Sequence, residues 1–176
     1  MQLTRNALDT GAGPGVWFTG SVFIDTIAAP AEGSRIAAAC VHFTPGARTA
    51  WHTHPHGQTI WVSEGVGLCQ RRGGPIEVIR PGDRVFFEPG EDHWHGAAPN
   101  RLMTHVAMQQ ADAAGNVVEW GDHVTDAEYA AAPAIDGDAP YSASVTWSPH
   151  STTLPASSAC CMATCVISRF GAAPCQ

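Results

Sequence analysis

Two histidine-bearing blocks limit what this chain can fold into more than any other pattern in it. The first, residues 46–58, reads GARTAWHTHPHGQ, and the second, residues 82–95, reads GDRVFFEPGEDHWH. Side chains two positions apart on an extended strand point to the same face, so we expect His52 and His54 to project together. Gln58 has the same parity, and His93 would come from a neighbouring strand of a closed sheet. The four side chains are therefore candidate ligands of a first-row transition metal.

Three alternatives to this ligand set follow from the same residues. Histidines also occupy polar edges and loops without any metal. Gln58 could be an amide spacer, in which case the metal would keep three protein ligands and water. His95 could replace His93 as a ligand, although the Pro-Gly-x-x-His spacing of the second block favours His93.

The two blocks resemble the two motifs of the cupin superfamily, Gly-x5-His-x-His-x3-Glu and Gly-x5-Pro-x-Gly-x2-His. The matching positions are Gly46, His52, His54 and Gln58 in the first block and Gly82, Gly90 and His93 in the second. Glu88 stands where the second motif usually has proline, and Gln58 replaces the usual glutamate. The wider sequence of residues 1–132 is similar to small bacterial cupins that include manganese-dependent hydroxynitrile lyases.

This resemblance implies an all-β fold, a cupin jelly-roll barrel, and a metal that acts as a Lewis acid. The implied reaction cleaves or forms cyanohydrins, with an aldehyde and cyanide as the other reactants. The implied metal is manganese, whereas the ligand types alone also suit Fe, Ni, Co or Zn. A His3Gln set carries no formal negative charge, so the ion would be less neutralised than in a His3Glu set and would favour an anionic ligand.

Strand parity places further side chains in the same predicted cavity. His105 and Gln109 share one face of the segment RLMTHVAMQQ, and Ala39 and Val41 share one face of the preceding strand. His105 is the candidate catalytic residue for proton transfer; alternatively it orients a ligand histidine or only fills the core. Ala39, Val41 and Gln109 are the candidate substrate-binding residues.

Short segments separated by Pro, Gly and Asp are typical of a β-sandwich or barrel. The expected strands are residues 17–27 with a bulge at Gly20, 34–43, 59–70 with a kink at Gly65 and Gly67, 76–80, 84–88, 93–98 and 101–110. Only TDAEYAAA, residues 125–132, predicts a helix. Thr125 would be its N-cap, and Glu128 has the spacing of a capping box.

Composition excludes several function classes. The formal net charge is −7 and there is no basic run, so we expect no nucleic-acid partner. The chain contains no lysine, which excludes Schiff-base chemistry on a lysine. Its apolar runs are too short to cross a bilayer and its N-terminus lacks an apolar signal core, so we expect a cytoplasmic protein without a membrane partner. The remaining partners are a small-molecule substrate and, by the resemblance, further copies in a homodimer or homotetramer.

The last part of the chain differs in composition from the rest. We expect a cupin domain at residues 1–132, followed at 133–176 by a linker and a poorly ordered tail rich in Ser, Thr, Ala and Cys. The tail holds Cys160, Cys161, Cys165 and Cys175, whose spacing lacks a partner motif for metal binding. Cys40 and Cys69 lie within the predicted barrel and are expected to be buried thiols.

Two other function classes fit the same blocks. One is a different metal-dependent cupin enzyme, namely a dioxygenase, a decarboxylase or an isomerase. The other is a non-catalytic cupin that binds a small ligand. Cupins are chemically diverse, so the fold by itself favours no single reaction.

Overall fold

The computed structural model describes residue 3 and residues 9–31 and 33–135. The predicted tail lies outside the described residues, except for the first residues of the expected linker. Within the described part, no helix is long and apolar enough to cross a membrane.

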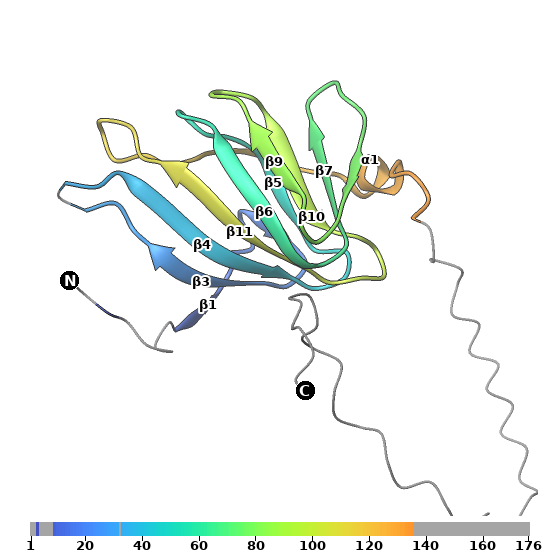
Figure 1. Cartoon of the computed structure of the whole chain (residues 1–176). Helices are drawn as coiled ribbons and strands as arrows, with labels where there is room; N and C mark the ends of the chain where they lie inside the picture. The colour runs from blue at the N-terminus through green and yellow to red at the C-terminus, as the bar shows by residue number, and fades with distance from the viewer. Residues whose placement is uncertain (1–2, 4–8, 32, 136–176) are drawn as a thin grey trace, which may run out of the picture. The chain divides into compact units, whose positions relative to one another are not determined.

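Two antiparallel β-sheets form the described domain (Figure 1). The first has the spatial order β1 (Thr10–Ala12), β3 (Val22–Ala28), β4 (Ile36–Phe43), β11 (Met103–Gln110), β6 (Gln58–Gly65) and β9 (Arg84–Phe87). The second has the order β12 (Glu119–His123), β5 (Arg48–Thr53), β10 (His93–Ala97), β7 (Gly67–Arg71) and β8 (Glu77–Ile79), and β2 (Phe18–Thr19) pairs with β5. This is the predicted jelly-roll arrangement.

Glycines mark the points where the chain passes from one sheet to the other. The expected strand over residues 59–70 is wrong as a single element, because it divides into β6 in the first sheet and β7 in the second. Gly65, with φ of 79°, ends β6. The expected strand over residues 17–27 likewise divides into β2 and β3 at Gly20, which has φ of 80°. Both bends need the positive φ that glycine adopts at little cost.

The core lies between the two sheets and consists of side chains from alternate residues along the strands. Its largest members include Phe43, Ile60, Met103 and Phe87, all nearly or fully buried. Cys69 is buried as expected, but the prediction for Cys40 is wrong, because this thiol is only partly buried. Parity explains the difference: Cys40 alternates with Val41, whose side chain faces the core.

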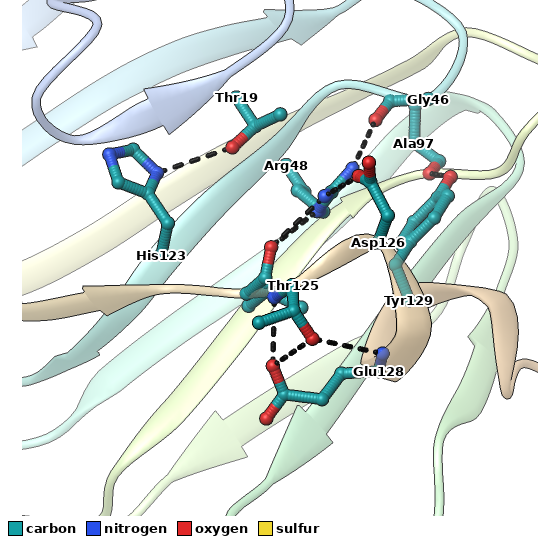
Figure 2. Close-up of polar contacts among 10 residues, drawn as sticks. Thr19, Gly46, Arg48, Ala97, His123, Thr125, Asp126, Glu128 and Tyr129 are labelled. Atoms are coloured by element: carbon teal, nitrogen blue, oxygen red, sulfur yellow. Dashed lines mark hydrogen bonds and ion pairs between the residues drawn. The ribbon is translucent and has the colours of Figure 1, made fainter.

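The predicted helix is confirmed as α1 (Asp126–Ala130), with Thr125 as its N-cap (Figure 2). The Thr125 and Glu128 side chains form the expected capping box, each bonding the other's backbone N–H. Buried Arg48 holds the helix to the sheet, donating to the Val124 carbonyl at 3.0 Å and pairing with Asp126 at 2.6 Å. The Tyr129 hydroxyl adds a 2.6 Å bond to the Ala97 carbonyl. These contacts attach α1 to β5 and β10 of the second sheet.

Candidate metal centre

The four predicted ligands lie in or next to three strands, β5, β6 and β10. His52 lies in β5 and His54 directly follows that strand, Gln58 begins β6, and His93 begins β10. His93 pairs in register with His52 across the second sheet. The His52 ring centroid is 4.2 Å from that of His93 and 5.2 Å from that of His54. All four side chains are buried, as a ligand set inside a barrel should be.

Each of the three histidines uses Nδ1 to bond a backbone carbonyl. His52 donates to Ala50 at 2.9 Å and His93 donates to Glu91 at 2.7 Å. His54 donates to Val117 at 2.6 Å. A proton on Nδ1 leaves the lone pair on Nε2. This tautomer can bind a metal through Nε2. Carbonyl bonds of this kind commonly orient metal-binding histidines.

Gln58 places its amide oxygen beside one of these lone pairs. Oε1 of Gln58 is 3.2 Å from Nε2 of His93, and Nε2 of Gln58 donates to Oε1 of Gln109 at 3.4 Å. Because the Glu91 carbonyl keeps the His93 proton on Nδ1, the 3.2 Å contact joins two acceptors. Adjacent ligand atoms about 2.1 Å from one ion, at right angles, would be about 3 Å apart. The Gln58 and His93 atoms therefore have a spacing that fits two ligands of one cation.

Burial keeps the histidines neutral. It lowers the pKa of His93 to about 3 and lowers the pKa of His54. The pKa of His52 also falls, first through burial and then through repulsion by the His93 and His54 rings. Neutral imidazole is the form that ligates a metal, so this site would not have to release protons from histidine at neutral pH.

His95 offers a competing ligand set. Ring nitrogens of His52, His93 and His95 all lie within 4.8 Å of one another. His95 is buried, yet among the described residues neither of its ring nitrogens has a hydrogen-bond partner. It thus lacks the carbonyl bond that orients the other three rings. His54 does not belong to this close group of ring nitrogens, and its buried Nε2 also lacks a partner within the described part of the chain.

A mainly apolar cavity of about 180 Å³ opens beside these histidines. An apolar cavity of about 150 Å³ is large enough for benzene, so this one can hold a small aromatic molecule. The residues that line it include all four predicted for catalysis and substrate contact, namely Ala39, Val41, His105 and Gln109, together with His52, His54 and Gln58. His93 does not line the cavity, and its ring stacks on that of Phe87 with the ring centroids 3.7 Å apart.

His105 reaches this cavity from β11 of the first sheet. Its ring is fully buried, stacks on Phe43 at 5.5 Å and meets the His95 ring edge-on at 4.9 Å. Burial lowers the pKa of His105 to about 3, and its two ring nitrogens have no partner among the described residues. An unpaired buried polar atom costs about 1–3 kcal/mol, so such a ring is ready to bond a ligand or water.

The sequence of this chain is similar to those of known proteins. Residues 39–105 match the family model of the cupin domain. The chain is 54% identical over 120 residues to a protein named (R)-mandelonitrile lyase from Granulicella tundricola; the match covers 68% of this chain and 91% of that protein. The chain belongs to the cupin family.

Solved cupin structures share the fold. A cupin-like protein from Thermotoga maritima is 35% identical to this cupin, with a TM-score of 0.64, over 71% of this chain and 95% of that one. A cupin-2 domain protein from Rhodospirillum rubrum is 18% identical with a TM-score of 0.56, over 74% and 84% of the two chains. The second likeness concerns the fold alone.

Sequence reasoning missed two tryptophans of this cupin's cavity. Trp17 and Trp120 stack with ring centroids 5.4 Å apart, and the Trp120 ring lies 4.8 Å from the ring of His52. Trp120 belongs to β12, an unpredicted strand that pairs with β5 and aligns Trp120 with His52. The segment GNVVEWGDH does alternate in part, but its exposed polar residues hid the strand signal.

Proposed function

We propose that this cupin is a metal-dependent carbon–carbon lyase that cleaves cyanohydrins to an aldehyde and cyanide, and forms them in the reverse direction. The observation that carries the proposal is the joint arrangement of ligands and cavity. Three histidines with Nδ1 bonded to a backbone carbonyl and the Gln58 amide lie close to one another, and His52, His54 and Gln58 line an apolar space fit for a small aromatic group. The name of the 54% identical relative supports the same reaction.

His52, His54, Gln58 and His93 would hold the ion, with manganese as the first choice and Fe, Ni, Co or Zn as the others. A divalent ion supplies a Lewis acid that lowers the pKa of the substrate hydroxyl. The neutral His3Gln set leaves the charge of the ion largely uncompensated, which favours an anionic ligand. We infer that His95 is not a ligand, because its ring lacks the carbonyl bond that fixes the tautomer of the others.

His105 is the residue we assign to proton transfer. Burial keeps its imidazole neutral, which leaves a ring nitrogen with a lone pair for the hydroxyl proton of the cyanohydrin; because a pKa of about 3 makes this a weak base, the transfer requires that the pKa of the hydroxyl is lowered as well. The electron pair left on oxygen forms the carbonyl double bond, and the carbon–carbon bond to the nitrile breaks with its pair leaving on cyanide. The resulting imidazolium lies in a site that disfavours charge, and it returns the proton to cyanide as hydrogen cyanide.

Gln109, Ala39 and Val41 would position the substrate. The Gln58 amide donates to Oε1 of Gln109, which leaves the NH2 group of Gln109 to donate to the substrate oxygen or to the departing nitrile. Ala39 and Val41 are small wall residues that leave room for the rest of the molecule. The apolar walls exclude water from the reacting groups.

Benzaldehyde release from racemic mandelonitrile tests the proposal. The manganese-loaded protein would be compared with metal-free protein and with the His52→Ala variant, at mildly acidic pH to suppress spontaneous decay. We expect release that depends on the metal and is lost in the variant. Absence of release from protein with confirmed metal content would contradict the lyase, and oxygen consumption assays would then test for a dioxygenase.

A further inference from the structure

The orientation of His54 depends on a part of the chain that is far away in sequence. His52 and His93 each bond a carbonyl two residues earlier in their own segment. His54 instead bonds the carbonyl of Val117, which lies 63 residues later, between β11 and β12. His54 also lies beyond the end of β5, so strand pairing does not hold it. The backbone of His54 is held by the N–H groups of Gly57 and Gly90, which donate to its carbonyl, but the hydrogen bond that orients its ring depends on whatever fixes Val117.

The loop that carries Val117, residues 111–118, is built around the side chain of Asp112. Oδ1 of Asp112 accepts the backbone N–H groups of Ala114 and Asn116, both at 2.8 Å. Oδ2 accepts the Asn116 side-chain amide at 3.1 Å. The backbone N–H of Asp112 donates to the Asn116 carbonyl at 2.8 Å. One carboxylate thus fixes the residue directly before Val117.

We propose that Asp112 is a positioning residue for the metal centre, acting through the Val117 carbonyl on the ring of His54. This rests on the ligand set of the proposed function, but it concerns metal binding and requires no particular reaction. The chain of contacts is continuous: Asp112 holds Asn116, the next residue offers its carbonyl, and His54 Nδ1 donates to it at 2.6 Å. Val118, one residue further, lines the cavity.

The carboxylate suits this task better than a turn held by backbone alone. Its hydrogen bonds to Asn116 lower the pKa of Asp112, so the charged acceptor is present throughout the neutral range. Hydrogen bonds to a charged acceptor are shorter and stronger than those to a neutral one. The loop turns at Gly115, whose φ of 92° other residues rarely adopt.

Three variants of the full chain separate positioning from general stability. Asp112→Ala removes the acceptor, whereas Asp112→Asn keeps one oxygen for the two backbone N–H groups. Asp122→Ala, on an exposed position of β12, removes the same charge outside the loop. Mn²⁺ affinity would be measured on metal-free protein by calorimetry or electron paramagnetic resonance, without substrate. The His54 Nδ1–H resonance of the zinc-loaded protein reports the bond to Val117 directly.

We expect Asp112→Ala to weaken Mn²⁺ binding about tenfold, in the range found when partners of ligating histidines are removed. Asp112→Asn should lose less than about threefold, and Asp122→Ala should match the parent. The His54 proton should exchange faster only in Asp112→Ala. A folded Asp112→Ala variant with parental affinity would overturn the proposal, and so would equal losses in the Asn and Ala variants. Lyase activity plays no part in these outcomes.

Discussion

Gln58 is the single residue that most separates this candidate metal centre from the common cupin pattern. Its oxygen faces His93 at 3.2 Å, and its nitrogen bonds Gln109. The amide therefore links the candidate ligand set to a residue of the cavity wall, and it does so without a formal charge. A carboxylate at this position would neutralise part of the ion's charge and would lose the N–H donor to Gln109.

Gln58→Glu should consequently change affinity and activity in opposite directions. We expect Mn²⁺ to bind about tenfold more tightly, because an anionic ligand replaces a neutral one. Turnover of mandelonitrile should fall about tenfold or more, because the ion becomes a weaker Lewis acid. Titration with Mn²⁺ and steady-state kinetics measure the two effects. Equal or higher turnover in the variant would contradict the assigned role of the amide.

The buried histidines also predict how stability depends on pH. Burial lowers the pKa of His93 and of His105 to about 3, whereas a histidine in the unfolded chain titrates near about 6.5. Below about pH 6.5 the unfolded state therefore binds protons that the folded state does not. Stability is fully present above that pH and falls as the pH drops toward 3, by up to about 1.4 kcal/mol per pH unit for each such histidine.

Urea unfolding of the metal-free protein between about pH 7 and 5 measures this slope. The His105→Gln variant serves as the comparison, because glutamine does not titrate. Its slope should be smaller than the parent's by about one histidine's contribution. A parental stability that stays constant over this range would show that these rings are not held neutral by the fold.

Among the elements, the change of sheet between β6 and β7 could not be predicted from the sequence. The apolar run over residues 59–70 predicted a strand, and Gly65 and Gly67 predicted a kink within it. The structure instead ends one strand and begins another in the opposite sheet. Whether a glycine bends a strand or moves the chain to another sheet depends on long-range pairing, here of β6 with β11 and of β7 with β10. Local pattern contains no information on that pairing.

Gly65 can be tested against a glycine of the same conformation in open space. A Cβ on Gly65 would lie 1.9 Å from the Leu102 carbonyl oxygen, whereas a Cβ on Gly73, which has φ of 78°, would meet nothing within 4 Å. Gly73→Ala should cost about 1–2 kcal/mol through its positive φ. Gly65→Ala should cost at least about 3 kcal/mol, because the clash adds to that strain. Similar losses of unfolding free energy in both variants would contradict this explanation.

For the protein as a whole, the two motif blocks were sufficient to predict the jelly roll and to bring the candidate site residues together. Ala39, Val41, His105 and Gln109 reached one cavity because strand parity and the inward face of a barrel are set by local alternation. The features that were not predicted depend on contacts between residues far apart in the sequence. The Val117 carbonyl that bonds His54 and the Trp120 ring beside His52 both come from the segment after β11. The expected cytoplasmic location and homodimer or homotetramer stay predictions, the latter open to sedimentation analysis.

A ligand that binds only the folded state must stabilise the entire domain. Mn²⁺ at about one hundred times its dissociation constant should add about 2.7 kcal/mol to the free energy of unfolding. We expect the Tm to rise with added Mn²⁺ and to fall on chelation, and we expect His52→Ala to abolish the response. Thermal unfolding followed by circular dichroism would measure it. An equal rise in the variant would place the binding elsewhere in the protein.

A crystal structure of the Mn²⁺-loaded protein, with anomalous diffraction data at the manganese edge, would decide which side chains form the metal centre. The arrangement of hydrogen bonds predicts an ion bonded to Nε2 of His52, His54 and His93 and to Oε1 of Gln58. His95 would then remain unligated beside His105. An ion bonded to His52, His93 and His95, with His54 and Gln58 outside bonding distance, would contradict the proposed site and the reaction derived from it.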